Sequence, residues 1–314
     1  MEYATFKAEV EGNKSLTEAK RAEMLREKYD ALQRELNQTI EGTRMWKLAN
    51  RSIYGTDANE RMARTSKMNM IMHGDGHGGV HHHNGFLNVN GIFEGRFDTI
   101  LTNPPFGSNV EPTDKVQDSD VALDDEVEKL YQRRYKVPYT EARSRLLAAI
   151  GEPIGSLFAL SKNAHGKLGK IKTEVLFIER CLDLLKPGGR LGIVLPEGIF
   201  NNPSLTYVRE FVEDRARLMA VVSLPQETFA ASGASVKCSL LFLQKFTSEQ
   251  ANQYTALSAA ALAEVTEQHR PALEAERQRI AEAIACAKAA KDSAQQKTLK
   301  AELMVFEKRL TEQI

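Results

Sequence analysis

The sequence is poor in cysteine, has no excess of charge of either sign and contains no long apolar run. Its three cysteines are far apart and odd in number, which favours reduced thiols over a disulfide framework or a zinc site. The 42 Lys+Arg balance the 42 Asp+Glu, which argues against a protein that coats nucleic acid without specificity. Since neither a run of about 18 apolar residues nor a basic-then-apolar start occurs, no membrane span or secretion is predicted and a cytoplasmic protein is expected.

The rest of the composition, 42% hydrophobic and 27% charged, is that of a globular protein of one large or two modest domains. We divide the chain into three segments. Residues 1–47 are predicted to contain an amphipathic helix, because apolar side chains recur at a 4-3-4-4 spacing at Leu25, Tyr29, Leu32, Leu36 and Ile40. Residues 247–314 are rich in Ala, Glu, Lys and Leu, and they are predicted to form two helices in a hairpin or coiled coil, with Pro271 at a helix start.

Residues 48–246 alternate between strand and helix patterns. Short strands are predicted at SIYGTD and FDTIL, and helices at residues 60–74 and 172–189, each ended by glycine. The later runs RLGIVLP, LMAVVSLP and CSLLFLQK are typical of strands covered on both faces in a mostly parallel sheet. This segment is therefore predicted to be an open α/β sheet. Residues 74–95 are predicted to be a loop, with one short strand near Phe86 and Leu87.

Charge is uneven in the middle of the chain. Residues 110–128 hold eight acidic side chains against Lys115, which predicts a mobile loop. Residues 129–172 hold ten Lys and Arg against Glu141 and Glu152, a net charge of +8. The sequence thus has one basic segment.

The most informative residues are Asn103, Pro104, Pro105 and Phe106, which follow an apolar strand at the place where open α/β sheets bind ligands. Two prolines make the turn stiff and remove its N–H donors, so the Asn103 side chain and the Pro104 carbonyl can form a rigid pair of acceptors. Such a pair suits an NH2 group, and Phe106 offers a face for a base to stack on. The alternative is that the prolines merely end the strand and Phe106 fills the core.

Three motifs in order, GTD, NPPF after FDTIL, and KPGGRLGIVLPEGIF, resemble the adenine-N6 DNA methyltransferases. The similarity covers residues 50–246 and is greatest to the modification subunit of type I restriction-modification systems. It implies a Rossmann-like methyltransferase sheet, S-adenosylmethionine as cofactor and DNA as substrate. It also implies a separate specificity subunit, because no target-recognition domain is evident, and a restriction subunit as a further partner.

The resemblance also assigns roles to single residues. Asn103 and Pro104 would hold the adenine N6 amino group within the Asn103–Phe106 motif, and Phe106 would stack on the flipped base. Asp57 matches the acid that bonds the cofactor's ribose hydroxyls, although it could instead be the N-cap of the next helix. Asn84 stands where the family often has an Asp that reaches the cofactor's adenine amine.

One family motif is missing, the glycine-rich loop that normally precedes the GTD strand. Only Gly12 and Gly42 occur in residues 1–50. In the family the strand before this loop lies between the GTD and NPPF strands, so its absence is expected to leave both of them with unpaired edges. A late start, a degenerate fragment or a strand from another polypeptide would each explain this, and the helical pattern of residues 1–41 favours the first.

Other interpretations remain open. The same turn would suit a methyltransferase that acts on a protein glutamine amide or on RNA, and the missing motif would suit an inactive interaction protein. The basic segment 129–172 could contact the DNA backbone or be an ordinary solvated surface. No metal site is expected, because adjacent histidines in a glycine-rich loop lack the spacing of a metal motif; these are His73, His77, His81, His82 and His83.

Overall fold

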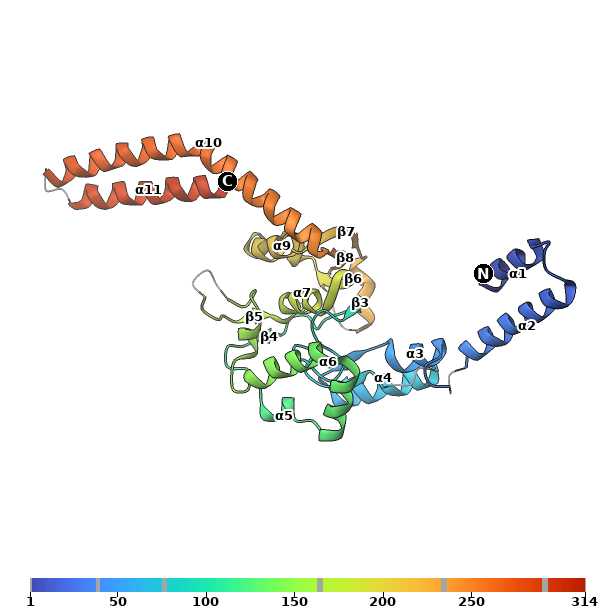
Figure 1. Cartoon of the computed structure of the whole chain (residues 1–314). Coiled ribbons are helices and arrows are strands. Elements are labelled where there is room, and N and C mark those ends of the chain that lie inside the picture. The colour runs from blue at the N-terminus through green and yellow to red at the C-terminus, as the bar shows by residue number, and fades with distance from the viewer. Residues whose placement is uncertain are drawn as a thin grey trace.

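The computed structural model describes residues 2–37, 40–74, 78–162, 166–232, 236–289 and 293–313. An α/β core lies between two helical extensions, α1 and α2 at the N-terminal end and the α10/α11 hairpin at the C-terminal end (Figure 1). In the described part of the chain, no helix is long and apolar enough to cross a membrane.

The N-terminal extension consists of α1 (Glu2–Gly12), α2 (Glu18–Glu35) and α3 (Arg44–Arg51). The predicted helix is present as α2, which begins where the Thr17 side chain accepts a hydrogen bond from the backbone N–H of Lys20 at 3.3 Å, but α2 has no buried residue and ends before Leu36 and Ile40 of the predicted stripe. Part of its apolar stripe stays exposed, since Tyr29 is 51% and Leu36 is 61% accessible. The helix α1 agrees with the helical pattern expected for residues 1–41.

The strands form two main sheets instead of one. β1 (Gly55–Asp57) and β2 (Val80–His82) make a parallel pair. β3 (Phe97–Thr102), β6 (Leu185–Pro196), β8 (Cys238–Lys245) and β7 (Ala216–Ser223) make a four-stranded sheet in the order β3-β6-β8-β7. No ladder in the described chain joins β1 to β3, so each is an edge strand, which is the gap that the missing motif predicts.

The four-stranded sheet is mixed, so the prediction of a mostly parallel sheet is wrong in one respect. β3 and β6 are parallel, whereas β8 is antiparallel to both β6 and β7. The apolar run CSLLFLQK correctly predicts a covered strand, but burial on both faces carries no information about strand direction.

Apolar burial is concentrated around α7 (Thr173–Leu184), which packs against β6, and α9 (Thr206–Glu213), which packs against β7. Leu176, Ile178 and Ile193 have no solvent-accessible surface, and they belong to one continuous cluster. Other apolar side chains of the sheet stay exposed. Leu101 is 78% accessible and lies beside Gly192, where a Cβ atom would approach its Cδ2 to 2.8 Å.

Two predictions about the loops are wrong. The strand expected near Phe86 and Leu87 lies earlier, at β2, because pairing with β1 overrides the polar character of the histidine run. The acidic stretch is ordered, with α5 (Asp118–Val121) and the start of α6 (Asp125–Ala148). Its acids cap helices: the Asp124 carboxylate accepts from two backbone N–H groups of the first turn of α6, a position that the helix dipole favours.

The remaining elements connect the core. They are α4 (Glu60–Met72), β4 (Asn109–Val110), η1 (Ile154–Leu157), β5 (Ile171–Lys172), α8 (Gly198–Asn201), η2 (Pro203–Leu205) and η3 (Gln226–Ser232). The helix α7 ends at Leu184, before the predicted glycines, and the Pro187-Gly188-Gly189 stretch belongs to β6.

The C-terminal extension is α10 (Ser248–Ala289) followed by α11 (Ser293–Gln313). The two helices lie side by side, which confirms the predicted hairpin (Figure 1). Ile280 is fully buried, and Arg277 pairs with Glu307 at 2.7 Å. The prediction that Pro271 starts a helix is wrong, because α10 runs without a break from Ser248 to Ala289 and contains Pro271. Proline prefers the first turn of a helix but is not confined to it.

Candidate active site

The turn Asn103–Phe106 begins directly after β3 ends at Thr102. Pro104 is buried and fixes the turn to the core, whereas Asn103 and Pro105 are exposed and Phe106 is half-buried. Within the described chain, the Asn103 side chain makes no hydrogen bond. An exposed amide beside a buried proline is therefore held at the carboxyl end of an edge strand, with an aromatic ring close after it.

Asp57 and Asn84 lie together at the carboxyl ends of the neighbouring strands β1 and β2. Asp57 is opposite His82 in the parallel ladder, and its carbonyl accepts from the backbone N–H of His83 at 3.1 Å. One oxygen of its carboxylate accepts from the backbone N–H of Asn59 at 2.7 Å. The alternative that Asp57 caps the following helix is wrong, since the Asn59 side chain is the N-cap of α4.

The Asn84 side chain forms a turn with its own loop, in which its Oδ1 accepts from the backbone N–H of Phe86 at 3.0 Å. This loop is anchored by Arg180 of α7. Arg180 donates to the carbonyl oxygens of Gly85 and Leu87 at 3.1 and 2.9 Å, and to Asn88 Oδ1 at 2.9 Å. The segment after β2 is thus fixed to the core by one buried guanidinium.

Burial lowers the pKa of Arg180, and the charge of Glu94, 3.8 Å away, opposes that shift. Glu94 also accepts from Asn88 and Arg145, so the buried charge is part of a hydrogen-bonded network. Sequence reasoning missed Arg180. The available signal was a basic residue between the apolar Ile178 and Leu182, on the face of α7 that its apolar residues predict to be buried.

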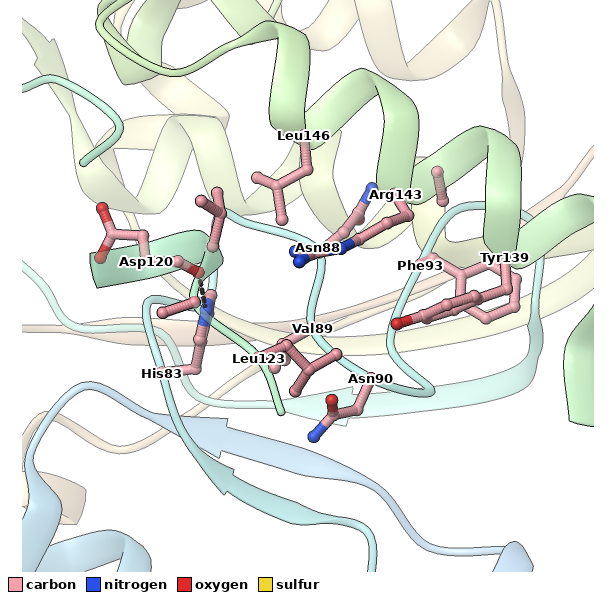
Figure 2. Close-up of a pocket in the computed structure, with 13 residues that line it drawn as sticks. His83, Asn88, Val89, Asn90, Phe93, Asp120, Leu123, Tyr139, Arg143 and Leu146 are labelled. Carbon is pink, nitrogen blue, oxygen red and sulfur yellow. Dashed lines mark hydrogen bonds between the residues drawn. The ribbon is translucent and has the colours of Figure 1, made fainter. Parts of the chain in front are cut away.

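A small cavity lies between this loop and α6 (Figure 2). Its volume is about 40 Å³, and apolar side chains such as Val89, Phe93 and Leu146 contribute to its lining. Three buried polar atoms of the lining have no hydrogen-bond partner in the described chain; they are Asn90 Oδ1, Tyr139 OH and Arg143 Nε. The volume suits one to a few water molecules, on the order of 15 Å³ each, and not a cofactor.

The histidines of the run contact different partners. His81 Nδ1 is 3.1 Å from Asn90 Nδ2, and burial lowers the pKa of His81 to about 4, so this ring is neutral and accepts that bond. His82 Nε2 lies 3.1 Å from the carbonyl of Ala58. His83 Nε2 lies 2.7 Å from the carbonyl of Asp120 (Figure 2). Among the described residues no cluster of His, Cys, Asp or Glu is arranged to hold a metal, and His77 lies outside them.

The predicted site residues therefore fall into two groups. The structure brings Asp57 and Asn84 together at one edge, and it presents Asn103–Phe106 as one turn, but the groups stand on separate sheets. Side chains connect β1 and β3 at the amino ends of these strands. There the rings of Tyr54 and Phe97 meet edge to face with centroids 5.8 Å apart, and the Tyr54 hydroxyl is 2.9 Å from that of Tyr135 in α6.

The chain is thus a mixed α/β protein with candidate polar groups at the carboxyl ends of parallel strands. The family model described as N-6 DNA Methylase matches residues 24–133 and 161–304, which is most of the chain. The chain belongs to the N-6 DNA methylase family.

Solved structures are similar at low identity. The M protein of the type I restriction enzyme EcoKI is 19% identical, with a TM-score of 0.43 over 70% of this chain and 36% of that chain. A modification subunit assigned to a type I restriction enzyme of Vibrio vulnificus is 19% identical, with a TM-score of 0.42 over 66% and 35%. A protein of Listeria monocytogenes assigned to the class I S-adenosylmethionine-dependent methyltransferases is 17% identical, with a TM-score of 0.39 over 63% and 45%. The chain spans less than half of each, and no curated protein matches it.

Proposed function

We propose that this chain carries the catalytic turn of an adenine-N6 DNA methyltransferase that uses S-adenosylmethionine. The observation that carries the proposal is the turn Asn103–Phe106, an exposed amide on a buried proline at the carboxyl end of β3. Membership in the N-6 DNA methylase family supports the same substrate and reaction.

The chemistry of the turn fits an aminopurine. The lone pair of the adenine N6 nitrogen is delocalised into the ring, so the free amine is a poor nucleophile. Asn103 Oδ1 and the Pro104 carbonyl would accept its two hydrogens and return electron density to the nitrogen. The half-buried Phe106 would stack on the base after it leaves the duplex, as enzymes that act on bases require.

Asp57 and Asn84 fit the cofactor's adenosine part. The turn at Asp57 uses one carboxylate oxygen, and a carboxylate is a suitable acceptor for ribose hydroxyls. Asn84 Oδ1 already accepts one bond, and a carbonyl oxygen has a second lone pair for an exocyclic amine. When bound, S-adenosylmethionine would supply an electrophilic methyl group to the amine held by Asn103 and Pro104.

We further propose that the chain acts within a type I restriction-modification system, because the order of its motifs is most similar to that of modification subunits. Its partners would then be duplex DNA, a separate specificity subunit that reads the target, and a restriction subunit.

The first test is methyl transfer from labelled S-adenosylmethionine to duplex DNA, RNA and protein in parallel. Label on adenine N6 in DNA is expected, whereas incorporation into protein or RNA alone would refute the proposal. Asn103→Ala should lower the rate at least about 100-fold, the typical cost of losing one transition-state hydrogen bond. Because Asn103 is exposed, the midpoint of thermal unfolding should not change, which separates loss of chemistry from loss of fold.

A second candidate function is an interaction protein whose core binds no cofactor. The separation of β1–β2 from the four-stranded sheet favours it. Calorimetric titration with S-adenosylmethionine distinguishes the two. Binding at micromolar strength supports the enzyme, and no binding by a folded chain supports the interaction protein.

A further inference from the structure

The basic segment 129–172 is divided into two parts by the fold. In residues 124–148, which cap and form α6, six basic side chains are accompanied by five acidic ones. Several of these charges are paired, such as Arg143 with Glu128 at 3.4 Å and Arg145 with Glu94 at 2.9 Å. The positive charge of α6 is therefore largely neutralised within the helix and its neighbours.

The second part has basic residues and no acid of its own. Residues 162–172 hold four lysines and no acid, namely Lys162, Lys167, Lys170 and Lys172. All four are exposed. Ile171 between the last two is 8% accessible, so strand alternation turns Lys170 and Lys172 outward together. We call residues 166–172 with Lys162 the lysine ribbon.

Backbone pairing places the lysine ribbon next to the catalytic turn. Ile171 and Lys172 pair antiparallel with Val110 and Asn109, which follow Phe106 closely in the chain. The backbone N–H of Thr173 also donates to the carbonyl of Ser108 at 3.1 Å. The ribbon is thus fixed to the segment that leaves the turn.

Glu111 is an acid that contacts the ribbon. Glu111 pairs with Lys170 at 2.6 Å, but the two side chains are 42% and 59% accessible, so this surface pair is weak and exchangeable. Asp114 nearby accepts from the backbone N–H of Glu111. A row of exposed lysines beside a turn that receives a flipped base has the charge and position of a contact to nucleic-acid phosphates.

We propose that the lysine ribbon holds the phosphate backbone of duplex DNA beside the turn Asn103–Phe106. This inference rests on the proposed function and names the surface that would bind its substrate. Phosphate contacts set the register of a protein on the duplex without reading its sequence. The ribbon would therefore contribute affinity and position, leaving target choice to other elements.

The test is fluorescence anisotropy of the full chain with a labelled duplex of about 30 base pairs, measured at several salt concentrations. Each phosphate contact adds about 0.9 to the magnitude of the slope of log K against log salt concentration. Lys162→Gln/Lys172→Gln should lower that slope by about two. Between about 50 and 200 mM salt, the fall in affinity should then be about tenfold smaller than in the parent chain. Glu111→Gln should raise the slope by up to about one, because it frees Lys170.

The matched control is Lys129→Gln/Arg133→Gln, which removes two exposed charges from α6. An unchanged slope in this control is expected. An equal effect in both double variants, a ribbon variant with the parent slope, or a folded parent chain that does not bind the duplex would each overturn the inference. Methyl transfer is measured separately, so a ribbon effect without methylation would refute only the proposed function, and methylation without a ribbon effect would refute only this inference.

Discussion

The four-stranded sheet and the β1–β2 pair are stabilised in different ways. The larger sheet is stabilised by apolar burial, with side chains such as Ile193 and Leu176 fully removed from solvent. The loop after the smaller pair is held both by the hydrogen bonds of Arg180 to its backbone and by Phe86 and Leu87, which belong to the apolar cluster of the larger sheet. Hence the proposed catalytic turn extends from a sheet with an apolar core, whereas the loop that holds the proposed cofactor residue Asn84 depends in part on one guanidinium that serves several partners.

The largest effect on stability is expected from Arg180→Leu. It would leave the carbonyls of Gly85 and Leu87 and the Asn88 Oδ1 atom without their donor, and Glu94 would keep only Arg145 as a charged partner among the described residues. Removing one member of a buried charged network costs about 3 to 5 kcal/mol in the free energy of unfolding. Urea unfolding measures it. The control is Glu60→Leu, which removes an exposed charge from α4. A cost of Arg180→Leu below about 1 kcal/mol would show that Arg180 does not hold the loop after β2.

A matched pair tests the apolar side of the comparison. Ile193→Ala should cost about 2 to 5 kcal/mol, because the side chain is fully buried in the sheet. Leu101→Ala, in the neighbouring strand but 78% accessible, should change the free energy of unfolding by less than about 0.5 kcal/mol. Equal costs in urea unfolding would show that Leu101 is covered in solution.

The two regions should respond oppositely to pH. Burial lowers the pKa of His81 to about 4, so the folded chain resists its protonation, and its contribution to stability is lost as the pH falls from about 6.5 towards 4. Burial, together with the charge of Glu179, raises the pKa of Asp183 in α7 from 3.8 to about 6. The contribution of Asp183 to the free energy of unfolding is therefore complete below pH 3.8 and is lost as the pH rises through about 6. Each slope is at most about 1.4 kcal/mol per pH unit.

Variants separate the two titrations. In His81→Gln the loss of stability towards acid should become smaller, whereas in Asp183→Asn the loss on raising the pH from about 4 to 6 should disappear. Chemical unfolding at several pH values measures both. If the two variants shifted the profile in the same direction, the assignment of one group to each region would be wrong.

The smallest effect is expected at the cavity beside the loop. Tyr139 is 3% accessible, and its hydroxyl has no partner among the described residues. Tyr139→Phe should therefore change the free energy of unfolding by less than about 0.5 kcal/mol, in either direction, because no protein hydrogen bond is lost. A loss of about 1 kcal/mol or more in urea unfolding would show that bound water bridges the hydroxyl to Asn90 or Arg143.

Sequence reasoning succeeded where apolar pattern decides the structure. The strand before Asn103, the helix α7 and the helical hairpin follow from their apolar patterns, and α7 contributes several of the fully buried side chains. It failed where polar groups decide. The acidic stretch contains helices because its acids act as caps, and Arg180 is visible only after the fold brings α7 to the loop at Gly85, far away in the sequence. For the site, the turn was predictable as a unit, and the missing motif predicted the unpaired edges of β1 and β3, but the partner of β1, which is β2, was not predicted.

The reversed direction of β8 has a further consequence. β8 begins beside Pro196 and ends beside Arg190. The chain therefore returns to the amino end of β6, away from the turn, before α10 begins at Ser248. The helix α3 likewise enters β1 at that end. Both helical extensions are thus attached at the base of the sheet, and the rim with Asn103 carries neither. The helical extensions and the proposed catalytic turn are thus at opposite ends of the strands, so a partner bound to either extension would leave the Asn103 end accessible.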